Sequence, residues 1–135
     1  MFVGEWEMGS SLTSDPASAP RARTTFEWMP GRRFLIQRWA VDIPEAPDGL
    51  AVIGAGADPG CFVQHYFDDR GVARIYQMKL VDRIWTLSRV ADAPDLSQRF
   101  TGTFTDLDTI RGTWEMSRDG STWHSDFDLI YRRIS

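Results

Sequence analysis

The chain has 135 residues, the usual size of a single domain, and is too short for a second one. With 42% hydrophobic and 25% charged residues, its composition excludes a disordered chain and a membrane protein. The formal net charge of −4 argues against nucleic acid as a partner, because nucleic-acid-binding domains carry basic surfaces that neutralise phosphates. We therefore expect one globular domain over residues 1–135 that binds neither nucleic acid nor a membrane.

Short segments in which hydrophobic and polar residues alternate run along the chain, separated by clusters of Gly, Pro and Asp. This pattern is typical of strands joined by turns, and helical periodicity is nearly absent. Residues 11–20, rich in Ser, Pro and Ala, are expected to form a long connection that could serve as a lid. Residues 42–49 and 54–60 are predicted to be loops. The predicted strands are residues 2–10, 22–29, 33–42, 49–54, 61–68, 72–80, 83–90, 97–104, 109–116 and 123–133.

An open sheet of this many strands would expose two edges, and closing the sheet removes them. The predicted fold class is therefore all-β, a closed or nearly closed antiparallel up-and-down β-barrel of about ten strands. A two-sheet sandwich with a solid core is the alternative, because the same alternation would serve it. Since side chains alone do not fill a barrel of this width, we expect an internal cavity.

The turn chemistry of two hairpins predicts which residues face each other. A type I turn over residues 68–71, with Gly71 in the left-handed conformation, pairs Tyr66 with Arg74, Gln64 with Tyr76 and Phe62 with Met78. The turn at residues 118–121 allows several loop lengths, and we favour a four-residue loop because it matches apolar with apolar residues. That loop pairs Met116 with Trp123, Gly112 with Phe127 and Ile110 with Leu129, and leaves His124, Asp126 and Asp128 facing solvent.

The face that carries Gln64, Tyr66, Arg74 and Tyr76 is the best candidate for a binding site, joined by residues of strand 33–42 if Leu35 points inward. Arg74 is the predicted anchor, because a buried guanidinium must pair with a carboxylate or with an anionic ligand. A purely structural network of Arg, Tyr and Gln explains the same residues equally well. The candidate ligand-binding residues are Gln37, Trp39, Gln64, Tyr66, Arg74, Tyr76, Met78, Trp85, Phe100 and Trp114, with Leu87 as a further wall.

No set of residues has the spacing of a known catalytic or metal site. His65 is the most obvious acid or base, but the predicted register turns it away from the face of Tyr66. The groups that could bind a metal, Cys61, His65, Asp68 and His124, lack any known ligand spacing, so we predict no metal. The single cysteine and the lack of a signal peptide indicate a cytoplasmic protein.

Three segments carry a family resemblance: Gly4-Glu5-Trp6-Glu7-Met8-Gly9, the hairpin Pro30-Gly31-Arg32-Arg33-Phe34-Leu35, and the ending Asp128-Leu129-Ile130-Tyr131-Arg132-Arg133-Ile134. Together they resemble the calycin superfamily of lipocalin-like barrels, above all its small bacterial members and more distantly nitrobindins and fatty-acid-binding proteins. The resemblance implies that Trp6 closes the barrel floor and that the barrel encloses a small apolar ligand.

Nitrobindins bind haem through a histidine on the last strand, and here the matching stretch is Asp126-Phe127-Asp128-Leu129-Ile130-Tyr131. A carboxylate is a poor axial ligand for haem iron, and His124 is offset by two residues, so haem is disfavoured and no cofactor is predicted. We expect a protein that binds a small hydrophobic or amphipathic molecule without catalysis. The alternatives are an enzyme of the cyclase or isomerase kind, in which a Tyr or His moves one proton, and a haem protein. A homodimer is left open.

Overall fold

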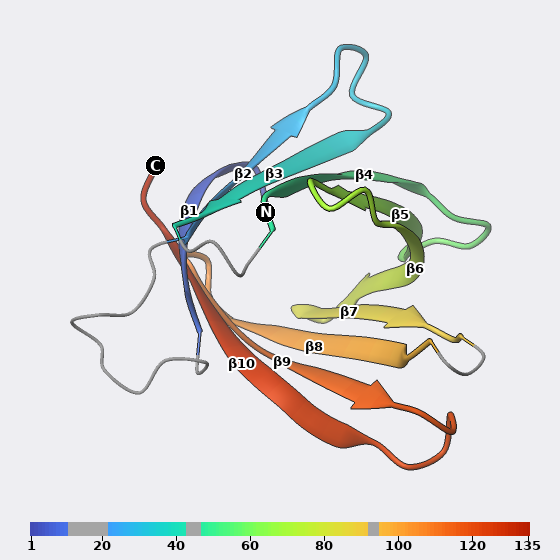
Figure 1. Ribbon diagram of the computed structural model, residues 1–135. Helices are drawn as coiled ribbons and strands as arrows, with labels where there is room; N and C mark the ends of the chain where they lie inside the picture. Colours follow the sequence, from blue (N-terminus) through green and yellow to red (C-terminus); the bar gives the residue numbers. More distant parts are fainter. Residues whose placement is uncertain (11–21, 43–46, 92–94) are drawn as a thin grey trace.

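Ten antiparallel strands close into one barrel in the computed structural model, which describes residues 1–10, 22–42, 47–91 and 95–135 (Figure 1). The strands are β1 (Gly4–Ser10), β2 (Ala22–Trp28), β3 (Leu35–Val41), β4 (Gly49–Ala55), β5 (Cys61–Asp68), β6 (Ala73–Val81), β7 (Ile84–Arg89), β8 (Ser97–Asp106), β9 (Thr109–Ser117) and β10 (His124–Arg133). Each strand pairs with its neighbours in sequence, and β1 also pairs with β10. The all-β up-and-down barrel is confirmed and the sandwich is excluded.

The strand ends fall within two residues of those predicted, because Gly, Pro and Asp mark nearly every turn. Strand β1 begins at Gly4 instead of residue 2, and strand β8 extends to Asp106 instead of residue 104. The lid expected at residues 11–20 lies outside the described residues, as does part of the loop expected at residues 42–49. No helix in the described ranges is long and apolar enough to cross a membrane.

Trp6, which the resemblance expects at the barrel floor, is fully buried near the start of β1. Its side chain has no exposed surface, and its indole nitrogen donates a hydrogen bond to the carbonyl of Phe2 at 2.8 Å. The guanidinium of Arg133 lies over the indole, 4.2 Å from the ring centroid. That guanidinium also donates hydrogen bonds to the carbonyls of Met1 and Val3, at 2.6 Å each, so it fastens the first residues of the chain to β10.

Aromatic rings pack the interior behind Trp6. Trp85 lies at the centre of this cluster, with ring centroids 4.9 Å from Phe100, 5.0 Å from Phe2 and 5.8 Å from Tyr131. Most of these contacts are edge-to-face, a favourable geometry for aromatic pairs. The aromatic residues buried here are Phe2, Trp6, Phe26, Trp85, Phe100, Phe104 and Tyr131. These rings fill the interior directly behind Trp6, and the candidate face predicted from the sequence lies toward the other half of the barrel.

The pairing predicted for the last hairpin is wrong. Phe127 pairs with Trp114 instead of Gly112, and Leu129 pairs with Gly112 instead of Ile110. Two features together produce this shift in pairing. The turn is longer than four residues, because the Asp119 carboxylate accepts hydrogen bonds from the backbone N–H groups at positions 121 and 122, and the register then shifts at a bulge between Ser125 and Phe127. From Phe127 onward the shift is two residues, so these side chains keep their predicted faces, and Asp126 and Asp128 are exposed. His124 lies before the bulge and pairs with Met116, on the same face of the sheet as Trp114, so it does not keep its predicted face, although it is exposed at the start of β10.

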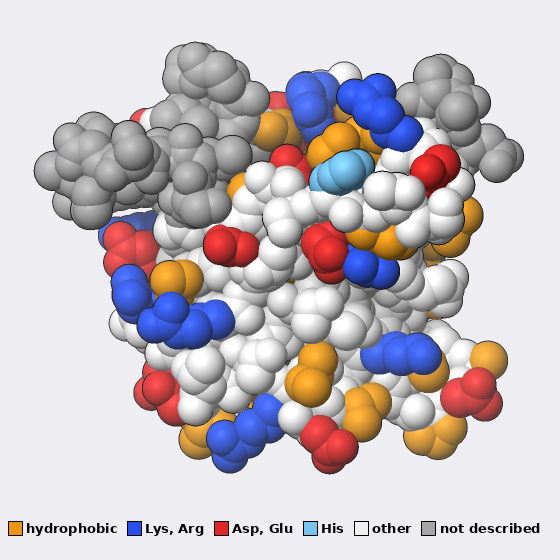
Figure 2. Space-filling model, turned by 90° about the horizontal axis from the view of Figure 1, so that it is seen from below, with side chains coloured by type: hydrophobic (Ala, Val, Ile, Leu, Met, Phe, Trp, Pro, Cys, Tyr) orange, Lys and Arg blue, Asp and Glu red, His pale blue; other side chains and the backbone are white. Residues whose placement is uncertain are grey.

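The side of the barrel shown in Figure 2 is polar and mixed in charge. Seen from below the view of Figure 1, basic and acidic side chains are interspersed, with only scattered hydrophobic groups between them (Figure 2). Some charges pair across neighbouring strands, such as Arg99 with Glu115 at 2.8 Å.

Candidate ligand-binding site

The hairpin of β5 and β6 has the predicted register, which places the candidate face toward the interior. Tyr66 pairs with Arg74, Gln64 with Tyr76 and Phe62 with Met78. Gly71 has a φ of 83°, the left-handed conformation that the turn requires. This register directs Gln64, Tyr66, Arg74 and Tyr76 inward and leaves His65 exposed on the outer face.

Aromatic side chains from four strands form a continuous wall at the half of the barrel away from Trp6. Trp39 of β3 stacks on Tyr66 of β5 with ring centroids 5.3 Å apart, and Tyr66 meets Tyr76 of β6 edge-on at 6.1 Å. Tyr76 in turn contacts Trp114 of β9 at 5.8 Å, across the interior and not along the sheet. Trp39, Tyr66 and Trp114 are only half-buried, unlike the rings around Trp85. Solvent therefore reaches the aromatic wall from this end.

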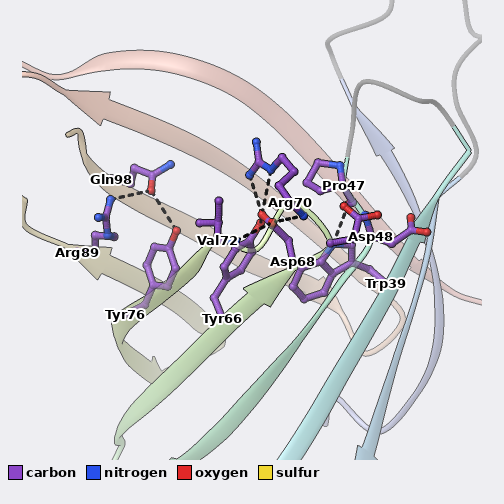
Figure 3. A network of polar contacts seen from close by, with 11 residues as sticks. Trp39, Pro47, Asp48, Tyr66, Asp68, Arg70, Val72, Tyr76, Arg89 and Gln98 are labelled. Carbon is purple, nitrogen blue, oxygen red and sulfur yellow. Dashed lines mark hydrogen bonds and ion pairs between the residues drawn. The ribbon is translucent and has the colours of Figure 1, made fainter. Parts of the chain in front are cut away.

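Hydrogen bonds hold the two phenol groups in place (Figure 3). The Tyr66 hydroxyl donates to the Asp68 carboxylate at 2.6 Å, and Arg70 donates to the same carboxylate at 2.7 Å. The Tyr76 hydroxyl donates to the Gln98 side-chain oxygen at 3.0 Å, which also accepts from Arg89 at 3.5 Å. These bonds fix the orientation of the rings toward the interior.

Burial keeps both phenols protonated near neutral pH. The pKa of Tyr66 is raised far above its usual value of 10.0, first by burial and then by the hydrogen bond and the negative charge of Asp68. Burial also raises the pKa of Tyr76, although a hydrogen bond and the positive charge of Arg74 oppose this effect. The hydrogen bond from Arg70 lowers the pKa of Asp68, so this carboxylate stays charged. Neither phenol can therefore act as a base at neutral pH.

Arg74 is the cation of the interior that has no ion pair within the described part of the chain. Its side chain is half-buried, and its guanidinium lies 6.0 Å from the ring centroid of Tyr66. Arg89, the neighbouring interior cation, differs because it forms an ion pair with Asp95 and donates to the carbonyl of Leu96 at 2.8 Å. Arg74 is thus the cation best placed to meet an anionic group inside the barrel.

Two buried polar atoms of the interior have no hydrogen-bond partner among the residues that the structure describes. The side-chain oxygen of Gln64 and the indole nitrogen of Trp85 are both buried and unpartnered. Leaving such an atom unpaired costs about 1–3 kcal/mol, so most buried polar groups are satisfied. Gln37, by comparison, donates to the Thr24 hydroxyl at 3.2 Å. The unpaired oxygen of Gln64 faces the same interior as Tyr76 and is available to a ligand or to water.

The structure divides the ten candidate residues into groups. Trp39, Tyr66, Arg74, Tyr76 and Trp114 lie together at the open half. Met78, Trp85 and Phe100 belong to the packed half, while Gln37 and Gln64 are buried on the wall. Sequence reasoning missed Arg89 and Gln98. The signal that could have found them is simple alternation: Arg89 follows Leu87 by two residues, and Gln98 precedes Phe100 by two.

Haem, which the resemblance to nitrobindins implies, does not fit this interior. The chain has two histidines: His65 is exposed on the outer wall, and His124 is exposed at the start of β10, where it pairs with Met116. The last strand turns Phe127, Leu129 and Tyr131 inward, and none of these supplies the imidazole that a nitrobindin uses. Among the described residues, no group of three His, Cys, Asp or Glu side chains is placed to hold a metal ion.

Comparisons with known proteins support the barrel fold and identify no family. No protein-family model matches the chain, and no curated protein matches it. Among solved structures, the chain is similar to Rv2717c from M. tuberculosis, with a TM-score of 0.65 over 99% of this chain and 93% of that one. The two sequences are 14% identical. The likeness therefore shows a shared barrel fold and leaves the ligand to be argued from the site.

Proposed function

We propose that the protein binds a small amphipathic molecule inside the barrel, with an apolar or aromatic body against the wall of Trp39, Tyr66, Tyr76 and Trp114. An anionic group of the ligand pairs with Arg74. The observation that carries the proposal is the position of Arg74: it faces the interior among aromatic rings and has no ion pair in the described ranges. A guanidinium in such surroundings needs an anionic partner.

Two further observations support this proposal over a purely structural network. The unpartnered side-chain oxygen of Gln64 supplies a second polar contact for the ligand. The half-buried rings of Trp39, Tyr66 and Trp114 supply an apolar surface that solvent reaches. Pockets for small molecules typically combine such walls with a few placed polar groups.

The enzyme alternative has less support. The raised pKa values of Tyr66 and Tyr76 make both phenols poor bases, and His65 is exposed on the outer wall, away from them. We therefore assign binding, and not turnover, to this site.

The test is a titration of ¹⁵N-labelled protein with laurate and with methyl laurate, followed through the indole N–H signals of Trp39 and Trp114. Arg74→Gln should weaken laurate binding by about 1.5 kcal/mol, or roughly tenfold, the low end for a charged hydrogen bond because Arg74 is partly exposed. The ester should be affected less. Lys79→Gln is the matched control, since Lys79 lies on the same strand with its side chain exposed on the outer face. If acid and ester respond alike in wild type and Arg74→Gln, or if neither moves these signals, Arg74 is not a ligand anchor.

A further inference from the structure

A second concave site lies at the opposite end of the barrel from Arg74. It is a groove of about 370 Å³, a volume typical of small-molecule pockets. The groove lies where β3 and β5 begin and where β4 and β6 end, whereas Arg74 lies near the start of β6. The groove is lined by Met1, Phe2, Val3, Trp28, Arg32, Arg33, Leu35, Ile53, Gly54, Ala55, Phe62, Met78 and Leu80.

The charges of the groove are all of one sign. Arg32 and Arg33 are its charged lining side chains, and no acidic side chain from the described ranges lines it. Both arginines are exposed, and neither guanidinium has an ion pair or a hydrogen bond within the described part of the molecule. The remaining lining residues are apolar or glycine. A groove of this composition is complementary to a molecule with an apolar body and a negative head.

The tight turn between β2 and β3 places the two arginines at the groove. The backbone N–H of Met29 donates to the carbonyl of Phe34 at 2.9 Å, and that of Arg32 donates to the carbonyl of Met29 at 2.9 Å. Arg32 itself has a φ of 56°, an unfavourable conformation for a residue with a side chain. Such conformations persist where the surrounding structure holds them, and they are frequent at binding sites.

Apolar side chains around the groove are exposed to an unusual degree. Met1 is 52% exposed, Trp28 46% and Val3 44%, and Met29 and Phe34 of the same turn are also exposed. Single exposed apolar residues are common, but a contiguous apolar surface that surrounds a groove marks an interaction site. These residues therefore extend the apolar surface available to a ligand beyond the groove itself.

We propose that this groove binds one molecule of an amphipathic anion, with its apolar chain along Leu35, Ile53, Phe62 and Leu80 and its acidic head on Arg32 and Arg33. The site is independent of the one at Arg74. A single molecule is favoured over an anionic bilayer for two reasons: the apolar surface is concave, and the net charge of −4 opposes approach to a negative membrane.

The test follows the indole N–H signal of Trp28 in ¹⁵N-labelled protein during a titration with laurate below its micelle concentration. Laurate should shift this signal saturably. In the double variant Arg32→Gln/Arg33→Gln, the laurate Kd measured at Trp28 should rise about fivefold, as expected for two solvent-exposed ion pairs. The signal of Trp39, at the other end of the barrel, should respond as in wild type, so the two sites are judged separately.

Matched controls separate the groove from general charge and folding effects. Arg83→Gln/Arg111→Gln removes the same charge from exposed positions outside the groove and should leave the Trp28 response unchanged. Ala55→Trp should fill the groove and suppress the response, whereas Ala57→Trp, an exposed alanine of the next turn, should not. Urea midpoints report whether each variant is folded.

Four outcomes would overturn the proposal: no response of Trp28 to laurate, an equal response to dodecyltrimethylammonium, a laurate affinity at Trp28 that the arginine variant leaves unchanged, or a Trp28 response that appears only with phosphatidylglycerol vesicles. The last result would assign the surface to a membrane. Concentration-dependent dimerisation that shifts the Trp28 signal without laurate would assign it to a second copy of the chain and would also overturn the proposal.

Discussion

Replacing Trp6 by alanine should destabilise the barrel by about 3–5 kcal/mol, the usual cost of deleting a large buried aromatic ring. The structure gives three reasons for a value in this range. The ring has no exposed surface, it meets Phe104 edge-on with centroids 6.3 Å apart, and it donates the hydrogen bond to Phe2. The truncation also removes the surface beneath the Arg133 guanidinium.

Trp6→Phe separates the hydrogen bond from the packing. Phenylalanine keeps most of the apolar volume but cannot donate to the Phe2 carbonyl, so we expect a smaller loss of about 1 kcal/mol or somewhat more. Trp28→Ala is the matched control, because Trp28 is 46% exposed and its loss should cost less than about 1 kcal/mol.

The assay is urea unfolding followed by circular dichroism, since a change of midpoint without a change of slope reports stability alone. Because single domains are stable by only about 5–15 kcal/mol, Trp6→Ala should shift the midpoint strongly and leave a protein that is close to unfolding. A loss below about 1 kcal/mol for Trp6→Ala, or equal losses for Trp6→Ala and Trp28→Ala, would show that Trp6 does not close the barrel floor.

Three other changes test different parts of the fold. Gly112→Ala should lower the free energy of unfolding in urea by about 1–3 kcal/mol, because the added carbon would lie 2.3 Å from the Phe100 ring. Gly9→Ala is the control and should cost far less, because its added carbon meets nothing within 4 Å. Equal losses for the two variants would contradict this packing. The pKa of Asp119 is lowered by hydrogen bonds from the backbone of Thr122 and Ser121 and from the Ser117 hydroxyl. The charged carboxylate therefore stabilises the fold above the usual carboxyl pKa of 3.8, and this stabilisation is lost as the pH falls toward the lowered pKa. The urea midpoint of wild type should therefore drop more steeply than that of Asp119→Ala between about pH 5 and pH 3, and parallel curves would count against the turn. Gln64→Met should leave the free energy of unfolding unchanged or raise it by up to about 1 kcal/mol, and it should weaken the laurate response at Trp39. A clear loss of stability would show that Gln64 has a structural partner.

The sequence predicted the barrel well because its signals are local. Alternation decides which face of a strand is buried, and Gly71 fixes the turn of β5 and β6, so the pairing of Tyr66 with Arg74 could be worked out from a few residues. The same approach gave the wrong pairing for β9 and β10. There the turn depends on hydrogen bonds to Asp119, and the bulge at Ser125 has no distinct sequence signal.

Contacts across the interior could be predicted much less well. Alternation places Tyr76 and Trp114 inward, but it does not show that rings from β6 and β9 meet at 5.8 Å. The groove was missed for a similar reason. The sequence does not show that Arg32 and Arg33 lie beside residues 1–3, because this proximity depends on how the chain folds back over the barrel end. Distances between strands that are far apart in sequence carry the functional information in this protein.

The pairing of β1 with β10 sets an order of events during synthesis. Residues 6–10 are synthesised long before their pairing partners, residues 129–133. Until then the nascent chain presents the open edges of β1 and β9, and exposed strand edges invite pairing with other chains. We therefore expect a chain that ends before residue 124 to aggregate more readily than one that includes β10, because β10 covers both edges.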